Sequence, residues 1–188
     1  DSYISTHNRS LYGENSLDNI KAHFPAWKHY YGRHLPADKN CRILDIGCGD
    51  GTFVYGLHTF GYKNTHGIDV SAEQINKGTA MGIPNLHCED LIQYLSANKA
   101  KYDVIVAKDV IEHFTREEVF EILPLISSNL NDGGRFIMQV PNGQGLFYTS
   151  IFYGDYTHEM AYTESSVNQV ILNTGFSSSK CYPTGPVP

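Results

Sequence analysis

"CRILDIGCGDGTFVYGL", residues 41–57, carries an apolar run, three alternating glycines and the beginning of a helical pattern. The run "ILDI" is typical of a buried β-strand, and the glycines let the backbone turn tightly before a helix starts. A strand that enters a helix through such a turn is common in α/β sheets that bind ligands beyond their strand ends. The stretch therefore predicts a strand–turn–helix unit with a ligand at the turn.

Strand-like and helix-like segments alternate along the following chain. The predicted strands are 41–46, 65–70, 85–90, 102–108 and 134–140, and the predicted helices are Thr52–Phe60, Ala72–Met81, Leu91–Ala97 and Arg116–Leu130. Ser71 and Thr115 fit helix N-caps, Ser71 forms a capping box with Gln74, and the turn residues 131–134 end the last helix. Three strands are nearly continuous apolar runs, as in parallel sheets. The pattern predicts an α/β fold, a doubly wound Rossmann-like, mostly parallel sheet with helices on both faces.

The regions on either side of this core have other patterns. Apolar residues at helical spacing over Ser16–Leu35 predict a helical segment that Pro25 breaks in two. Residues 141–162 are rich in Gly and Tyr with little periodicity, which indicates a long functional loop over the carboxyl edge of the sheet. Thr163–Asn173 is predicted to be a helix with Gly175 as its C-cap, followed by a late strand, "FSSSKCYP", at 176–183.

Composition excludes several classes of protein. The chain has 188 residues, of which 41% are hydrophobic and 18% charged, and its net charge is −6 without a basic cluster. We therefore expect one globular domain with no nucleic-acid partner and no membrane span. The four cysteines have no C-x-x-C spacing, which favours free thiols in a reducing cytoplasm. Because the first residue is Asp1 rather than Met, we expect that the natural start was removed. The Pro-rich end is consistent with a natural chain that continues.

The acids beside the glycine turn indicate the charge of the ligand. A dinucleotide fingerprint would place its third glycine where Thr52 stands, and no Gly-Lys-Ser/Thr of a phosphate loop follows. Asp45 precedes the turn and Asp50 lies within it, so a pyrophosphate would be repelled and a cation or ammonium group attracted. The sequence predicts a nucleoside-like ligand that is positively charged where a dinucleotide is negative.

From "ILDIGCGDG" onward, through "GIDVS", "HCEDL" and "YDVIVAKDVIEHF", the chain resembles class I S-adenosylmethionine-dependent methyltransferases over roughly Ile43–Phe176. The resemblance implies S-adenosyl-L-methionine as cofactor, with Asp69 on the ribose hydroxyls, Asp90 on the adenine amino group, and the backbone near Ala107 and Lys108 facing the methionine portion. The expected cofactor-binding residues are Asp45, Gly47, Cys48, Gly49, Gly51, Asp69, Val70, Asp90, Leu91, Ala107 and Lys108.

The same resemblance implies one methyltransferase domain over residues 1–188. Its expected parts are a helical N-terminal cap (1–40), a cofactor-binding core (41–140) and an acceptor-side loop, helix and last strand (141–188).

Two groups of polar residues are candidates for the acceptor side. Asp109 and His113 would share one face if that segment were helical, with Glu112 turned away, and Asp155, His158 and Glu159 cluster in the long loop. A hydroxyl acceptor must lose a proton, so we expect His113 or His158 to be the base, with Asp109, Asp155 and Glu159 orienting. No metal ligands are assigned, although Asp155, His158 and Glu159 offer an alternative metal set.

The loop "GDYTHEMAYT" resembles a subgroup of these methyltransferases that modifies sugars during polysaccharide or glycan assembly. Its carboxylates and imidazole could bind hydroxyls while the rings of Tyr148, Tyr153, Tyr156 and Tyr162 stack on a sugar. The expected function is methylation of a hydroxyl on a small-molecule or glycan acceptor. The alternatives are a protein or quinone-like acceptor, a non-catalytic cofactor-binding domain, and a nicotinamide-dependent oxidoreductase. The sequence does not indicate an oligomeric state.

Overall fold

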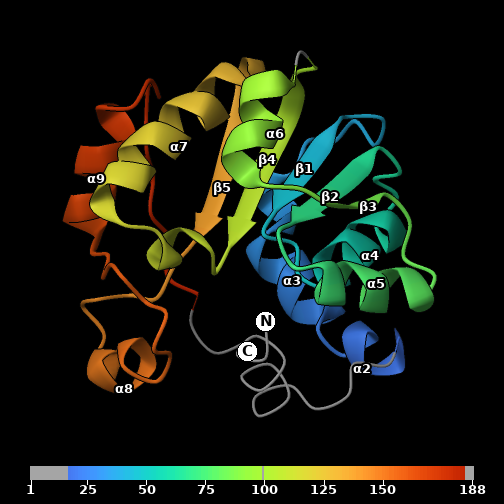
Figure 1. Cartoon of the computed structure of the whole chain (residues 1–188), viewed down its shortest axis with the longest axis horizontal. Coiled ribbons are helices and arrows are strands. Elements are labelled where there is room, and N and C mark those ends of the chain that lie inside the picture. Colours follow the sequence, from blue (N-terminus) through green and yellow to red (C-terminus); the bar gives the residue numbers. More distant parts are fainter. Residues whose placement is uncertain (1–16, 99, 185–188) are drawn as a thin grey trace.

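The computed structural model describes residues 17–98 and 100–184, and its centre is a five-stranded sheet (Figure 1). The strands are β1 (Ile43–Ile46), β2 (Thr65–Asp69), β3 (Leu86–Cys88), β4 (Tyr102–Lys108) and β5 (Leu130–Gln139). They lie in the order β3-β2-β1-β4-β5, and every pair is parallel. The chain thus adds β2 and β3 on one side of β1 and then β4 and β5 on the other side. The predicted doubly wound α/β fold is confirmed, and its strand order reverses at β1.

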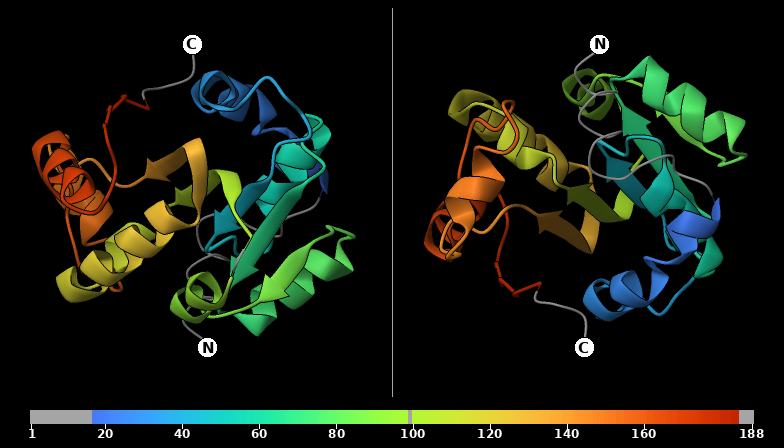
Figure 2. Two further views of the ribbon diagram at one scale, coloured as in Figure 1. Left: turned by 90° about the horizontal axis from the view of Figure 1, so that it is seen from above. Right: turned by 90° about the horizontal axis from the view of Figure 1, so that it is seen from below.

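Helices cover both faces of the sheet (Figure 2). On one face α6 (Leu91–Ala97), α7 (Arg116–Ser128) and α9 (Glu164–Leu172) share a buried cluster with Leu44, Ile46 and Ile105. On the other face α2 (Leu17–Lys21), α3 (Phe24–Tyr30) and α4 (Thr52–Thr59) pack with Ile43 and Val104, while α5 (Ala72–Ala80) packs beside α4. Alternate residues of one strand therefore supply both clusters, which is why the central strands are apolar throughout.

The predicted helix starts are confirmed by side-chain caps. Ser71 accepts from the Gln74 N–H at the start of α5, and Thr115 forms a complete capping box with Glu118 at the start of α7. The predicted end of α7 is wrong, because the helix ends at Ser128 and the turn residues 131–134 lie within β5. They coincide with a register shift between β4 and β5, where Gly133 has a φ of +75°. Turn-forming residues here make an irregular strand rather than a helix end.

The N-terminal segment forms two helices, as expected, but Pro25 is not the break. The chain leaves the helix at residues 22–23, and Pro25 lies in the first turn of α3, where its missing N–H costs nothing. A 3₁₀ turn, η1 (Gly32–His34), follows α3. Residues 1–16 of the expected cap lie outside the described ranges, so its extent stays a prediction, as does the division of the chain into three parts.

The region after β5 departs most from expectation. A short helix that the sequence did not predict, α8 (Tyr148–Phe152), interrupts the long loop, and α9 begins after its cap Thr163 as predicted. The expected late strand at 176–183 is wrong, because these residues form neither helix nor strand and are mostly exposed. Phe176 stacks on Phe136 of the edge strand β5 at 5.7 Å between ring centroids, yet the segment is not part of the sheet. No helix in the described ranges has the length and apolar character needed to cross a membrane.

Candidate active site

The carboxyl ends of the parallel strands bring most of the predicted site residues to one edge of the sheet. In Figure 1 the arrowheads of β4 and β5 point toward the side where α8 lies. The turn 47–51 follows β1, Asp69 ends β2, Asp90 follows β3, and Asp109 follows β4. This arrangement is the one in which doubly wound sheets bind their ligands.

The glycine turn has a backbone that only glycine adopts without strain. Gly47 and Gly49 have φ angles of +64° and +56°, in the left-handed region. A Cβ on Gly47 would lie 2.5 Å from Cγ2 of Val110, so this glycine lets the turn lie against the segment after β4. A Cβ on Gly49 would meet no atom within 4 Å. Gly49 therefore exposes its backbone to open space, where a ligand can approach.

Asp69 fastens the turn to the end of β2. Its Oδ2 accepts from the Gly49 N–H at 2.8 Å, and its Oδ1 accepts from the Ser71 N–H at 2.8 Å. The Cys48 N–H also donates to the carbonyl of Ile68 at 3.0 Å. The carboxylate thus shapes the turn and remains at the strand end, beside the side chain of Val70, which is 71% exposed.

Asp45 lies almost fully buried in β1, directly before the turn. Burial raises the pKa of its carboxyl to about 7; the charge of Lys108 acts in the opposite direction, and that of Asp69 raises the pKa further. Asp50 does not share this role, because its Oδ2 lies 3.2 Å from Nζ of Lys77 in α5. Asp50 is therefore paired within the protein, and the remaining acids near the turn are Asp45, with 2% of its surface exposed, and Asp69.

The other predicted cofactor residues occupy varied environments. Asp90 caps α6 by accepting from the Gln93 N–H at 2.9 Å, and Leu91 begins that helix. Ala107 is fully buried in β4, so what it can present to a ligand is its backbone. Cys48 is also buried, and burial raises the pKa of its thiol, which leaves it a neutral packing group.

Asp109 is directed to the end of β5 rather than toward the imidazoles. Its carboxylate accepts from Nε2 of Gln139 at 2.9 and 3.0 Å and pairs with Nζ of Lys108 at 3.0 Å. The hydroxyl of Tyr31, the C-cap residue of α3, donates to the other end of the same Gln139 amide. The backbone at Asp109 has a φ of +56°, so no α-helix runs through it. The expectation that Asp109 and His113 share a helix face is therefore wrong.

His113 ends the 3₁₀ turn η2 (Ile111–His113), and the loop holds its ring. Its Nδ1 lies 2.9 Å from the Thr157 hydroxyl, and that hydroxyl donates to Oδ1 of Asp155 at 2.7 Å. Because the hydroxyl proton goes to Asp155, Nδ1 of His113 is the donor to Thr157, which leaves Nε2 with its lone pair. Burial lowers the pKa of His113, and the neighbouring His158 lowers it further.

The ring of His158 is also fixed by a hydrogen bond at its Nδ1. Its Nδ1 lies 2.9 Å from the carbonyl of Phe152 at the end of α8, and a carbonyl only accepts, so Nδ1 carries the proton. The His158 ring lies 4.9 Å from the His113 ring between centroids. The two predicted candidate bases therefore stand together, and Nδ1 of each ring is engaged by the loop.

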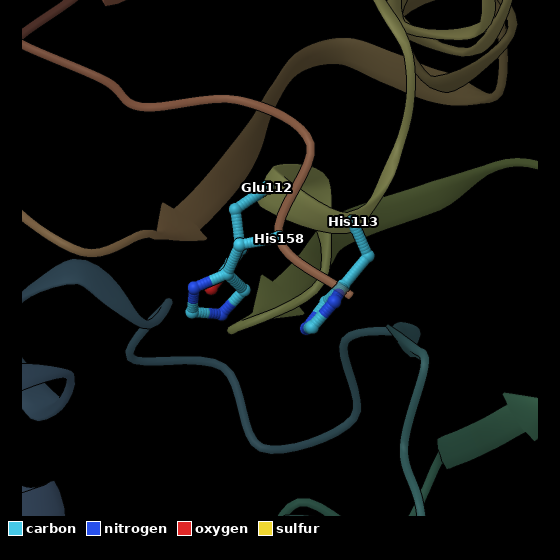
Figure 3. A group of neighbouring side chains, drawn as sticks. All are labelled: Glu112, His113 and His158. Atoms are coloured by element: carbon cyan, nitrogen blue, oxygen red, sulfur yellow. The ribbon is translucent and has the colours of Figure 1, made fainter. Parts of the chain in front are cut away.

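Glu112 is the residue of this edge that sequence reasoning missed. It is fully buried, and neither carboxylate oxygen has a hydrogen-bond partner among the described residues. Burial raises the pKa of its carboxyl to about 8. One atom each from Glu112, His113 and His158 lies within 4.8 Å of the others, and Figure 3 shows the three side chains extending to the same side. The assumption of helical spacing placed the Glu112 side chain on a different face from Asp109 and His113. The direct adjacency of Glu112 and His113 in the sequence was the signal that could have identified it.

The remaining residues of the loop have supporting positions. The carbonyl of Glu112 accepts from the N–H groups of Glu159 and Met160 at 2.8 and 3.1 Å, while the side chain of Glu159 is exposed. Among the described residues, the group close enough to share a cation is Glu112, His113 and His158, so the alternative metal set of Asp155, His158 and Glu159 is corrected.

Two of the four tyrosines expected to stack on an acceptor are exposed in the loop. Tyr153 and Tyr156 are 78% and 94% exposed. Tyr162 is buried in the core, so its expected role is wrong. A separate hollow lined by Asp38, Cys41 and Asp103 lies at the opposite, amino ends of the strands, away from all these groups.

Comparison with known proteins agrees with this geometry. A family model described as a methyltransferase domain matches residues 6–176. A ubiquinone biosynthesis O-methyltransferase of Rickettsia canadensis is 30% identical over 118 residues, 61% of this chain and 49% of that protein. A ribosomal protein L11 methyltransferase of Shewanella baltica is 28% identical over 102 residues, 53% of this chain and 33% of that protein. The chain spans half or less of the length of these curated relatives.

Solved structures share the fold. A SAM-dependent methyltransferase from Archaeoglobus fulgidus has a TM-score of 0.74 and 27% identity, with 93% of this chain and 74% of that chain covered. Magnesium protoporphyrin IX methyltransferase from Synechocystis, solved with bound SAH, has a TM-score of 0.65 and 20% identity, with 95% and 86% covered. The chain therefore belongs to the methyltransferase-domain family, and S-adenosylmethionine is its cofactor.

Proposed function

We propose that this chain transfers the methyl group of S-adenosylmethionine to a hydroxyl group of a small-molecule acceptor. The observation that carries the proposal is the pairing, at one edge of the sheet, of an acid-flanked glycine turn with two adjacent histidines whose Nδ1 atoms the loop engages, which leaves Nε2 of each as the ring nitrogen for an acceptor. The first feature suits a cationic nucleoside, and the second suits an acceptor that must lose a proton.

On the cofactor side, each predicted residue has a task that fits its place. Asp69 accepts from the ribose hydroxyls with lone pairs left over from its two backbone bonds, and exposed Val70 covers the adenine ring. Asp90 accepts from the adenine amino group while it caps α6. The backbone of Ala107 and Lys108 faces the methionine portion, and Asp45 attracts its positive charge.

On the acceptor side, methyl transfer needs alignment and one proton transfer. The acceptor oxygen attacks the methyl carbon, the carbon–sulfur bond breaks, and S-adenosylhomocysteine leaves with a neutral thioether. The hydroxyl proton goes to Nε2 of His113 or His158. Asp155 acts through Thr157, which fixes the His113 ring, and Glu159 faces solvent at the rim, where it can meet acceptor hydroxyls.

The exposed rings of Tyr153 and Tyr156 support a sugar or glycan acceptor, since aromatic faces stack on sugar rings. A quinone-like phenol is a second candidate. It is supported by the relatives named ubiquinone biosynthesis O-methyltransferase and by the exposed apolar side chains of Leu146 and Phe147 in the same loop.

A turnover assay with a defined acceptor panel tests the proposal. S-adenosylhomocysteine release is measured with nucleotide sugars, free glycans, catechol-type phenols and a lysine-rich peptide, with a no-acceptor control. We expect turnover with a hydroxyl acceptor; preference for phenols over sugars selects the second candidate. Methylation of the peptide alone contradicts a hydroxyl acceptor, and cofactor binding without any turnover supports a non-catalytic domain instead.

A further inference from the structure

Glu112 has no role assigned so far, and it forms a compact group with the two candidate bases, His113 and His158. One candidate ligand atom from each lies within 4.8 Å of the other two. Ligand atoms that share a transition-metal ion at about 2.1 Å lie roughly 3–4 Å apart. Rotations of the three side chains, which extend to the same side in Figure 3, would bring these atoms to that separation around an ion. We propose that Glu112, His113 and His158 bind a divalent transition-metal cation of the Zn²⁺ and Mn²⁺ class.

The buried carboxylate points independently to a ligand. Glu112 has no exposed surface, and both of its oxygens lack a hydrogen-bond partner among the described residues. Buried polar atoms in folded proteins are almost always paired, because an unpaired one loses its hydration without compensation. A cation between Glu112 and the two imidazoles supplies the missing partner.

Both imidazoles are already oriented as metal ligands usually are. Ligating histidines as a rule donate their second ring N–H to a carbonyl, carboxylate or other acceptor, which fixes the ring and directs the lone pair to the metal. Nδ1 of His158 donates to the Phe152 carbonyl, and Nδ1 of His113 donates to the Thr157 hydroxyl, which Asp155 holds. The supporting shell of a metal site is therefore present.

The surrounding charge favours a cation as well. Asp109 and Asp155 lie close enough to interact electrostatically with Glu112, and the opposing charge of Lys108 is partly offset by its pair with Asp109 at 3.0 Å. Two imidazoles and one carboxylate suit Zn²⁺, Mn²⁺ or Fe²⁺ better than Mg²⁺ or Ca²⁺, which prefer all-oxygen ligands. Three protein ligands leave coordination positions for other molecules.

The open positions give the cation a role, and this role, unlike the binding itself, rests on the proposed function. An acceptor hydroxyl that coordinates a divalent cation has a lowered pKa, so its proton can pass to solvent water. The two histidines would then act on the hydroxyl through the cation instead of taking the proton directly.

Titration of the metal-stripped 188-residue chain with Co²⁺, followed by displacement with Zn²⁺, tests the binding. Co²⁺ in a site with nitrogen ligands has a visible absorption that reports its coordination, and Mg²⁺ serves as the ion that should compete poorly. We expect one equivalent of Co²⁺ to bind, and we expect Glu112→Gln and His158→Ala each to weaken binding by about 100-fold or more. Thr157→Val should weaken it by about 10-fold to 100-fold, because the orienting hydroxyl is lost.

His87→Ala is the matched control. His87 is exposed on β3 and stacks with His66 at 6.1 Å between ring centroids, so it belongs to the other histidine pair of the described structure. Its substitution should leave Co²⁺ binding unchanged. Circular dichroism and S-adenosylmethionine binding verify that each variant is folded.

The outcomes separate this inference from the proposed function. Absence of Co²⁺ binding in the folded wild type overturns the metal site, as does binding that survives Glu112→Gln but disappears with His87→Ala. Neither result changes the expectation of methyl transfer. Conversely, specific Co²⁺ binding by a chain that methylates no acceptor would support the site while contradicting the proposed function.

Discussion

The two halves of the candidate active site are built differently. The cofactor edge (residues 45–51, 69–70 and 90–91) consists of strand ends and the turns directly after them. Its parts are joined by short hydrogen bonds, such as the one that the Gly49 N–H donates to the Asp69 carboxylate. The acceptor edge (residues 109–113 and 141–162) joins a 3₁₀ turn to a loop 44 residues away, through the contact of His113 with Thr157. It carries exposed rings and a buried carboxylate that has no hydrogen-bond partner within residues 17–98 and 100–184.

This difference follows from what each half must recognise. The cofactor edge can be encoded within a few contiguous motifs, since a parallel sheet delivers its strand ends to one place. The acceptor edge depends on how one particular loop folds back over η2. Loops vary more in sequence between related proteins than the helices and strands that they connect. The cofactor edge should therefore tolerate little substitution and the acceptor edge should determine which molecule is methylated.

The largest expected effect is a loss of turnover on substitution of the acceptor edge, without a loss of cofactor affinity. Of His113→Gln and His158→Gln, the variant that removes the base should lower the rate of methyl transfer by about 10²–10⁴-fold, because the group that takes the acceptor proton is lost. S-adenosylmethionine affinity, measured by calorimetry, should stay unchanged. His29→Gln, an exposed position on α3, is the control that should alter neither quantity. A parallel loss of cofactor affinity would show that the two edges are not independent.

The next effect should be confined to the cofactor edge. Asp69→Ala removes charge-assisted hydrogen bonds worth about 3 kcal/mol together, which corresponds to an affinity loss of about 100-fold for S-adenosylmethionine. Calorimetry measures the loss, and Asp132→Ala, at an exposed position in β5, is the control. Equal affinities of the Asp69 variant and the wild type would exclude this carboxylate from the binding site.

Alanine substitution of two glycines distinguishes the effect of backbone strain from the effect of blocking the approach of the ligand. Gly49 and Gly82 have φ angles of +56° and +81°, and a Cβ on either would meet no atom within 4 Å. Alanine at either position should lower the free energy of unfolding by about 1–2 kcal/mol, as measured by urea denaturation. Only Gly49→Ala should also weaken cofactor binding, by about tenfold, because the methyl group occupies the approach to the turn. Similar affinity losses in both variants would assign the effect to strain alone.

The last prediction is a pH dependence from Asp45, whose effect on cofactor affinity is the smallest of the series. Its pKa of about 7 lies above that of an unfolded aspartate, so between about pH 4 and 7 folding requires proton uptake. The wild type should thus lose stability relative to Asp45→Asn as the pH rises through this window. The charged groups that act on Asp45 are Lys108 and Asp69, and the Tyr31 hydroxyl and Cys48 thiol also interact with it.

Cofactor affinity should change with pH in the opposite direction. The positively charged ligand favours the ionised form of Asp45, so wild-type affinity should rise by several-fold as the pH passes about 7, and that of Asp45→Asn should stay flat. Denaturation and calorimetry at a series of pH values measure both trends. A flat wild-type profile would indicate that Asp45 does not face the ligand.

Most of the fold was predictable because its signals are local and periodic. Apolar runs located the strands, and the caps at Ser71 and Thr115 located helix starts to the residue. The late strand at 176–183 is wrong although Phe176 lies against the edge strand β5, because composition does not reveal whether a segment beside a strand also pairs with it.

The site was predictable in its parts but not in its geometry. The family motifs named Asp69, His113 and His158, yet helical spacing gave the wrong neighbours for Asp109 and hid Glu112. A left-handed residue followed by a 3₁₀ turn changes the direction of each side chain, and periodicity does not encode such a change. Lys77 was likewise not foreseen as the partner of Asp50, because their pairing depends on how α5 packs.

The carbonyl of Glu112 accepts the N–H groups of Glu159 and Met160 together. Lifting the loop would break both bonds at once, so the two amides form one opening unit whose hydrogen-exchange rates should rise and fall in step. The same event would uncover the carboxyl behind them to water. Opening of the loop and hydration of the Glu112 carboxyl would then be the same motion. The hydrogen-exchange rate of the Glu159 or Met160 amide would measure how often the loop opens.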